Sequence, residues 1–310
     1  MIPSLLVARR LQNYLQSRNM KISTLTFLLF LLITACGQKQ ESLPGKPVVS
    51  VTILPQKYFV EQLAGTRVEV NVMVPPGASP ATYEPSVSQL SKLDQSDLYL
   101  KMGYLGFELS WMNKICSVNS SMEVINLSDG VELIYGMEAE EVHDGHGHHH
   151  GGIDPHIWMS ARNARVMAVN MAGALTRLLP DDSLQIAGNL STLLGKIDSL
   201  DLELTTILAE VKGNSFMIYH PSLSYFAKDY KLEQLALEWE GKIPSPSHMR
   251  KLTDLGKDHQ ITTIFIQEEF DRKNAEVLSL EIGALIVPIN PLDTNWPGQM
   301  MHIATNLKEQ

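Results

Sequence analysis

The sequence has few cysteines, no excess of basic residues and no apolar run as long as a membrane span. Its 310 residues include two cysteines, 25 Lys and Arg residues and 34 Asp and Glu residues, which gives a formal net charge of −9. The deficit of basic charge disfavours nucleic acids and anionic lipid headgroups as partners, because both are densely negative. A negative chain tolerates cations as partners, although charge alone does not identify a metal site.

The N-terminal residues have the plan of a secretory signal peptide. From Met20 the chain reads "MKISTLTFLLFLLITACGQ", with one basic residue, a short apolar run and small residues before Cys36. The apolar run is shorter than the about 20 residues that a transmembrane helix needs. The first 35 residues hold four basic residues and no acidic one, so the chain after them carries a net charge of −13.

The run "LITAC" resembles the lipobox of bacterial lipoproteins, in which the cysteine thiol is lipidated and the chain is cut just before it. We therefore predict an N-terminal extension and lipoprotein signal peptide at 1–35, with Met20 as the start, and a lipidated N-terminus and tether at 36–46. A signal peptide that is cut elsewhere, with an incidental cysteine, is the alternative. If Cys36 carries lipid, Cys116 has no disulfide partner, and such a lone thiol is more often buried than functional.

Strand-like and helical segments alternate along the rest of the chain, which favours α/β units with parallel sheets. Helices are predicted from Pro55 to Gly65 and from Ser160 to Leu179. The strand candidates are rich in β-branched residues or bounded by turn residues. They are "KPVVSVTIL" at 46–54, "RVEVNVMV" at 67–74, "DLYLKM" at 97–102, "MEVINL" at 122–127, "SFMIYH" at 215–220, "TTIFIQ" at 262–267 and "ALIVPIN" at 284–290.

A long amphipathic helix is predicted in the middle of the chain. After Pro180, apolar residues recur at three- and four-residue steps as far as Val211, and Gly213 ends the pattern. Roughly 30 residues of helix would extend about 45 Å, which is enough to run along two domains. We predict α/β lobes at 47–180 and 214–310, joined by a rigid linking helix at 181–213. The alternative is an amphipathic helix that lies on one continuous sheet.

Histidine is the residue type that points to function. The tract "HDGHGHHHGG" from His143 to Gly152 precedes His156 in "DPHIW", and His220 follows the strand "SFMIY". Neutral imidazole is the commonest protein ligand for borderline-soft divalent metals such as zinc. For either single histidine, a hydrogen-bonded core residue is the more common interpretation. The pair together with the tract favours metal binding.

The segment 138–152 is predicted to be a histidine-rich loop of the first lobe. It would form a weak accessory site that raises the local concentration of metal, through His143, His146, His148, His149 and His150. A solvated loop with no selected role is the alternative, because such a composition cannot bury a core.

Polar residues follow several of the predicted strands. His220 ends one strand, Glu269 lies just after "TTIFIQ", Asn290 and Asp293 follow "ALIVPI", and Glu84 lies beyond "NVMV". In open α/β sheets, ligands bind outside the carboxyl ends of the strands. Residues from both halves of the chain can therefore meet in one cleft.

Four segments together carry a family resemblance. They are "PPGASPATYEPSVSQLSKLDQSDLYLKMG", "GGIDPHIWMSARNAR", "FMIYHPSLSYFAKDYKLEQLALEWEGKIPSPSHMRKL" and "IFIQEEFDRKNAEVLSLEIGALIVPINPLDTNW". From about Pro47 onward the chain resembles the zinc/manganese ABC-transporter solute-binding lipoproteins, the cluster A-I metal-binding proteins. The resemblance implies two lobes joined by a rigid helix, one metal ion in the cleft between them, a histidine-rich loop over the cleft and delivery to an ABC permease in the inner membrane.

The resemblance also implies which residues bind the metal. The family's histidines in "DPHIW" and "YH" fall on His156 and His220, but Ala81 replaces the histidine that usually follows "GASP", and Asn290 replaces the aspartate of "DPL". Alanine cannot donate to a metal, and an amide oxygen is a weaker ligand than a carboxylate. We expect Asp293 and Glu269 to complete the site, with Glu84 and Asn290 as alternatives.

We therefore expect an extracytoplasmic, membrane-anchored lipoprotein, periplasmic or at the cell surface, that captures zinc and delivers it to a permease. It would be a monomer with no organic cofactor and no nucleic-acid partner. Manganese or iron becomes the cargo if carboxylates dominate the site. Two other classes remain: a surface metal-buffering or adhesion lipoprotein that is not coupled to uptake, and a zinc hydrolase. The sequence has neither the "HExxH" nor the "GxSxG" motif of hydrolases, so we expect no enzyme.

Overall fold

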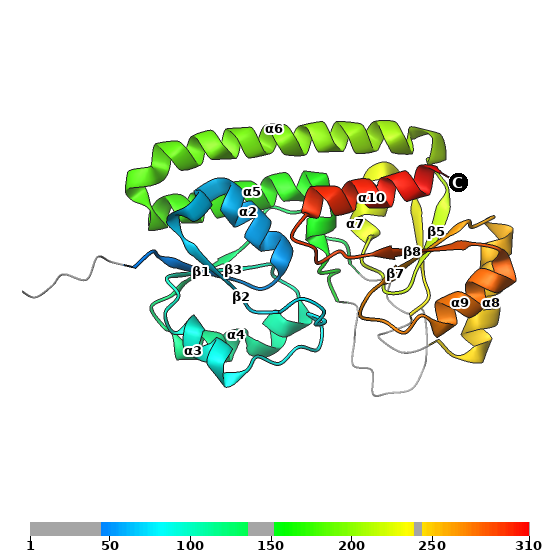
Figure 1. The fold of residues 1–310 in the computed structure, drawn as a ribbon, viewed down its shortest axis with the longest axis horizontal. Helices are drawn as coiled ribbons and strands as arrows, with labels where there is room; N and C mark the ends of the chain where they lie inside the picture. Colours follow the sequence, from blue (N-terminus) through cyan, green and yellow to red (C-terminus); the bar gives the residue numbers. More distant parts are fainter. Residues whose placement is uncertain (1–44, 136–151, 239–243, 310) are drawn as a thin grey trace, which may run out of the picture. The chain divides into compact units, whose positions relative to one another are not determined.

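Two separate four-stranded sheets organise the chain (Figure 1). The computed structural model describes residues 45–135, 152–238 and 244–309. All strands are parallel, and the strand orders are β2-β1-β3-β4 and β6-β5-β7-β8, so the two sheets have the same topology. The strands are β1 (Val48–Val51), β2 (Glu69–Val72), β3 (Leu98–Lys101), β4 (Glu123–Asn126), β5 (Ser215–Ile218), β6 (Glu233–Ala236), β7 (Thr263–Gln267) and β8 (Leu285–Ile289).

Helices connect successive strands within each lobe, as parallel sheets require. In the first lobe they are α2 (Leu54–Ala64), α3 (Val87–Leu93) and α4 (Gly106–Val118). In the second lobe they are α7 (Ser224–Tyr230), α8 (Pro246–Asp258) and α9 (Lys273–Ile282), and α10 (Trp296–Lys308) follows the last strand. The residues of β7 are all buried, which explains the three consecutive apolar residues at its centre.

Two long helices lie between the two sheets in sequence. Ser160 caps α5 (Ala161–Leu178) by accepting a hydrogen bond from the backbone N–H of Asn163. The helix α6 (Ser183–Leu208) has 26 residues, or about 39 Å at about 1.5 Å per residue. It packs against α2 of the first lobe and α10 of the second (Figure 1). The prediction of two parallel α/β lobes joined by one long helix is therefore confirmed.

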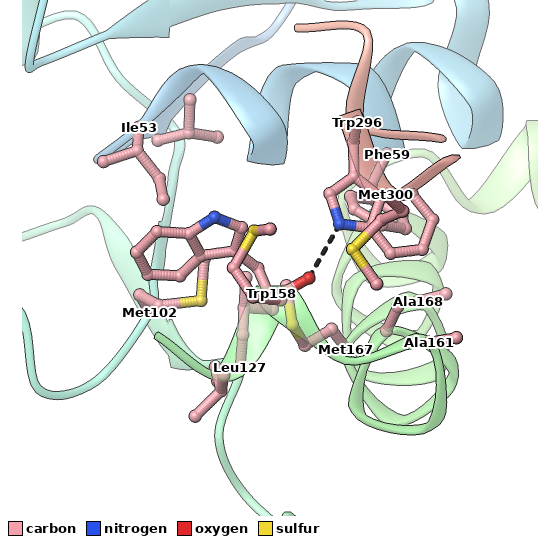
Figure 2. Packing of buried hydrophobic residues seen from close by; sticks show 14 of the residues in the cluster. Ile53, Phe59, Met102, Leu127, Trp158, Ala161, Met167, Ala168, Trp296 and Met300 are labelled. Atoms are coloured by element: carbon pink, nitrogen blue, oxygen red, sulfur yellow. Dashed lines mark hydrogen bonds between the residues drawn. The ribbon is translucent and has the colours of Figure 1, made fainter. Parts of the chain in front are cut away.

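A shared apolar core joins the first lobe to the C-terminal helix. Two buried tryptophans are hydrogen-bonded to each other, because Trp296 Nε1 donates to the backbone carbonyl of Trp158 at 2.7 Å (Figure 2). Trp158 Nε1 in turn donates to the carbonyl of Pro291 at 2.8 Å. The Trp296 ring lies 5.1 Å from that of Phe59 on α2. The loop before α10 is thus fixed to the first lobe.

Some expectations differ from the structure or fall outside it. The strand β6 was not predicted, and Cys116 on α4 is exposed rather than buried. The predicted signal peptide at 1–35, Cys36 and the five histidines of the tract lie outside the described residues. Within the described residues, no helix is both long and apolar enough to span a membrane.

Candidate metal centre

His156 lies just before a short helical turn, Ile157–Met159, that leads into α5. Asp154 fixes the histidine: its Oδ1 atom accepts the His156 backbone N–H at 2.9 Å and lies 2.8 Å from His156 Nδ1. Burial raises the pKa of Asp154, but the charge of His156 and the hydrogen bonds with it outweigh burial, and the pKa is lowered overall. Asp154 is therefore an ionised partner that holds the imidazole ring in one orientation.

His220 stands two residues after the end of β5 and has a matching carboxylate. Its Nδ1 atom lies 3.1 Å from Oε2 of Glu238, whose side chain is only 9% exposed. Gln267, at the end of β7, holds the backbone around the histidine, because its Nε2 atom donates to the His220 carbonyl at 2.8 Å and to Ser222 Oγ at 2.9 Å. The second histidine is therefore positioned by its own lobe.

The imidazole rings of His156 and His220 lie next to each other in an edge-to-face arrangement although they are 64 positions apart in the chain. The ring centroids of His156 and His220 are 5.2 Å apart at an angle of 71°. A carboxylate at Nδ1 leaves Nε2 as the atom that can bind a metal, and metal-binding histidines commonly have such a carboxylate partner. The pair fits the donor chemistry of a zinc site.

A cavity of about 300 Å³ surrounds the two rings. Its lining includes Ser79, Pro80, Ala81, Leu105, Gly106, Gly152, Asp154, Pro155, His156, Trp158, His220, Pro221, Ser222, Gln267, Glu269, Phe270, Pro291 and Leu292. The Phe270 ring stacks on that of His220 at 5.4 Å, and Trp158 lies 5.2 Å from His156. Apolar walls of this kind lower the local dielectric constant and strengthen the attraction between an ion and its ligands.

Glu269 is the carboxylate in the cavity lining whose charge acts on both histidines. Burial raises the pKa of Glu269, while its own backbone N–H and the charges of His220 and His156 oppose the rise. This side chain keeps contact with solvent, so it can turn toward an incoming cation. Within the described residues, however, no group of three or more His, Cys, Asp and Glu side chains is already arranged to hold a metal ion.

The other expected ligands do not line the cavity. Asp293 Oδ1 accepts the backbone N–H of Asn295 at 2.7 Å, and Asn290 Oδ1 accepts that of Leu292 at 3.0 Å. Glu84 is exposed and is also not part of the lining. The side chains of Asp293 and Asn290 therefore stabilise turns at the end of the second sheet, and Leu292 rather than a carboxylate lies in the cavity wall.

Ala81 does line the cavity and forms part of its wall in the first lobe. The backbone of Gly106 is packed so closely on this loop that a Cβ atom at Gly106 would lie 2.6 Å from the Ala81 carbonyl oxygen. The next residue, Phe107, donates its backbone N–H to the Pro80 carbonyl at 2.8 Å. The wall is therefore held firmly, with a methyl group at the position where the resemblance leads us to expect an imidazole.

Glu238 and Gln267 were missed from the sequence. Glu238 is the second residue after β6, so a correct assignment of that strand would have placed it at the carboxyl edge of the sheet. Gln267 was included in a predicted strand, but its amide has no distinctive sequence signal.

Comparisons with known proteins agree with this geometry. A family model described as the periplasmic component A of a zinc-uptake complex, ZnuA, matches residues 49–310. The zinc-binding lipoprotein AdcA of Streptococcus pneumoniae (strain ATCC BAA-255 / R6) is 28% identical over 281 residues, which cover 88% of this chain and 56% of that protein. The high-affinity zinc uptake system protein ZnuA of Bacillus subtilis (strain 168) is 26% identical over 279 residues, covering 85% of this chain and 86% of that protein.

A solved structure supports the same relationship. A crystal structure of ZnuA has a TM-score of 0.78 and 33% sequence identity, and the match covers 86% of this chain and 99% of that chain. The chain spans little more than half the length of the AdcA relative. Since the family model matches more than four-fifths of the sequence, the chain belongs to the family of the periplasmic component A of zinc-uptake complexes.

Proposed function

We propose that this protein captures a zinc ion outside the cytoplasm and delivers it to an ABC permease for import. The observation that supports the proposal most strongly is the adjacent pair His156 and His220, in which each histidine has a carboxylate partner and lines a cavity between the lobes. Imidazole nitrogens suit zinc better than manganese or iron, whose sites use more oxygen ligands. The names of the two curated relatives support the same choice of metal.

The ion would be bound by His156 Nε2 and His220 Nε2, with Glu269 as the third ligand because its carboxylate lines the cavity. Asp293 is the fourth ligand that we propose from the sequence. To reach the ion, its side chain would have to give up the hydrogen bond to Asn295. A water molecule can occupy that position instead, and an open position is compatible with a site that must release its ion.

Three further features complete the proposal. Cys36 would carry the lipid that anchors the protein to a membrane, and the protein would act as a monomer. The histidine tract would collect ions weakly near the cavity. Membership in a family of solute-binding transport components supports a binding role rather than catalysis.

The experiment is zinc titration calorimetry with the metal-free protein, together with measurement of its metal content. We expect one tight zinc site that His156→Ala and His220→Ala each abolish. The control is His302→Ala, because this exposed histidine on α10 bonds to the Pro288 carbonyl away from the cavity. Tight zinc binding that survives both cavity substitutions would contradict the proposal.

A metal-buffering or adhesion lipoprotein that is not coupled to uptake is the second candidate. The observation in its favour is Ala81, which places an apolar methyl group in the cavity wall. Growth of a strain without the gene separates the two functions. A growth defect in chelator-treated medium that added zinc rescues supports uptake, whereas normal growth in that medium supports buffering or adhesion.

A further inference from the structure

The hydroxyl group of Tyr225 lies at a junction between two chain segments. Tyr225 belongs to α7 and is only 2% exposed. Its hydroxyl oxygen accepts the backbone N–H of Ile134 at 3.0 Å, and the hydroxyl donates to the carbonyl of Asp154, also at 3.0 Å. Ile134 and Asp154 also pair with each other, because the Asp154 N–H donates to the Ile134 carbonyl at 2.9 Å. One side chain thus holds two backbone segments that are 20 positions apart.

The Asp154 segment carries one of the two histidines. The Asp154 carboxylate bonds to both the backbone N–H and the Nδ1 atom of His156. Any shift of the Asp154 backbone therefore moves the imidazole. Tyr225 holds this backbone from the second lobe, five positions after His220. The hydroxyl of Tyr225 is thus a direct link between the chain segments that carry the two adjacent imidazole rings.

The link does not change with pH in the neutral range. Burial, chiefly, raises the pKa of Tyr225 to about 12, so the hydroxyl keeps its proton and remains a donor to Asp154. A second contact reinforces the arrangement, because Ser160 Oγ donates to Asp229 Oδ2 on the same helix at 2.5 Å. Helix α7 is therefore bonded to the His156 segment on both sides of that histidine.

We propose that Tyr225 is a positioning residue that sets the distance and angle between His156 and His220 before any ion arrives. The inference rests on the zinc-binding function proposed above. It predicts that the Tyr225 hydroxyl, which itself contacts neither imidazole ring nor the ion, controls zinc affinity through the position of Asp154.

The test compares Tyr225→Phe with Tyr230→Phe in the full chain. Tyr230 is a matched control because it lies on the same helix, is 6% exposed and uses its hydroxyl in a hydrogen bond of 2.8 Å to Asp201 on α6. Both variants lose one hydroxyl group, and we expect similar, small decreases in Tm. Only Tyr225→Phe should raise the Kd for zinc, by about 10- to 100-fold, as the loss of an outer-shell contact does.

A second measurement uses the metal-free protein. The ring signals of His156 in NMR spectra should shift in Tyr225→Phe and stay at their wild-type positions in Tyr230→Phe. If Tyr225→Phe fails to fold, Ile134→Pro takes its place in the test. This substitution removes the N–H that donates to Tyr225 without changing α7, and it should shift the same His156 signals.

The outcomes separate the two hypotheses. Unchanged zinc affinity and unchanged His156 signals in Tyr225→Phe would overturn the positioning role. Equal loss of affinity in the two tyrosine variants would also overturn it, because it would reflect general loosening of α7. If the wild-type protein binds no zinc, the proposed function fails, while the His156 signals still decide whether Tyr225 positions that ring.

Discussion

The two lobes have the same strand order, yet the carboxyl edges of their sheets are used differently. At the edge of the first sheet, Glu108 accepts the backbone N–H groups of Met102 at 2.7 Å and Gly103 at 2.6 Å and the hydroxyl of Thr52. The Glu108 side chain is buried, and its hydrogen-bonding capacity is used within the lobe. This carboxylate stabilises the fold and is not available to a ligand.

At the edge of the second sheet, several polar side chains line the cavity. His220 stands two residues after β5, Gln267 ends β7, and Glu269 lies two residues after β7. The loops at the carboxyl edge of the first sheet line the same cavity mainly with small and apolar residues such as Ala81 and Leu105, whereas Asp154 and His156 come from the segment that leads into α5. Shared topology places polar groups at equivalent edges of the two sheets, and the hydrogen bonds already made there decide which of these groups can bind an ion.

Glu238→Gln should have the largest effect on zinc affinity among the substitutions that follow from this comparison. The change removes the charge that supports His220 in the second lobe while it keeps the side-chain shape. We expect a 10- to 100-fold increase in the Kd for zinc, measured by competition with a chelator of known affinity. The control is Glu233→Gln, since Glu233 at the start of β6 bonds to Ser215 and His259 instead. Equal effects of the two substitutions would contradict the assigned role of Glu238.

Ala81→His should reduce the difference between the two lobes. The substitution adds an imidazole to the wall of the first lobe, where Ala81 is exposed and lines the cavity. A further nitrogen ligand should tighten zinc binding by roughly tenfold and slow its release. Stopped-flow measurement of zinc transfer to a chelator tests both effects. The control Ala81→Leu should not tighten binding, and tightening by leucine would point to a packing effect instead.

Glu108→Gln should lower the free energy of unfolding and leave the Kd for zinc within about twofold, because the oxygens of the Glu108 carboxylate already accept hydrogen bonds inside the first lobe. Replacing one carboxylate oxygen by an amide NH₂ leaves a backbone donor without its acceptor, which costs about 1–3 kcal/mol. Urea unfolding and zinc titration of the same sample test both statements. A large loss of zinc affinity would show that the two edges are not independent.

The same carboxyl group gives a pH dependence with a definite sign. Burial raises the pKa of Glu108, although its hydrogen bonds oppose the rise. Between the ordinary pKa, about 4.3, and the raised value, the folded state keeps a proton that the unfolded state has released. The free energy of unfolding of the wild type should therefore fall relative to Glu108→Gln as pH rises through this window, and the difference should be constant above it. A rise instead of a fall would contradict the assignment.

Removal of residues 138–150 should have the smallest effect on the tight site. The proposed ligands are held by hydrogen bonds within the described residues, so the Kd of the tight site should not change. Uptake at scarce zinc should become slower, because the zinc ions that the histidine tract binds weakly near the cavity are lost. Calorimetry and growth at limiting zinc test the two statements, and unchanged uptake would contradict the accessory role.

Residue chemistry explains which parts could be predicted from the sequence. The sequence singled out His156 and His220 because imidazole is a common metal ligand, and the structure places both rings in one cavity, while their binding of a metal stays a prediction. The strands rich in β-branched residues were identifiable from composition. The strand β6 has the sequence "EQLA", with no β-branched residue, and it forms through its pairing with β5. Such pairing depends on distant residues, so neither β6 nor the position of Glu238 could be read from the local sequence.

The direction of side chains in turns was also beyond the sequence. Asp293 is near Asn290 in the chain, but its backbone N–H bonds to the Asn290 carbonyl at 3.0 Å and its carboxylate bonds to Asn295. This tight turn determines which side chains line the cavity. Distance along the chain says little about where a side chain points in such a loop.

The position of Trp296 has a consequence for how the protein folds during synthesis. Its ring packs beside Phe59 on α2, although it is synthesised long after that helix. A growing chain that already contains every strand of the first sheet therefore still lacks part of that lobe's core. We expect a fragment that stops before Trp296 to expose apolar surface around Phe59 and to bind a hydrophobic dye, with the signal lost in the full chain. The lobe that begins first would thus be among the last parts to be completed.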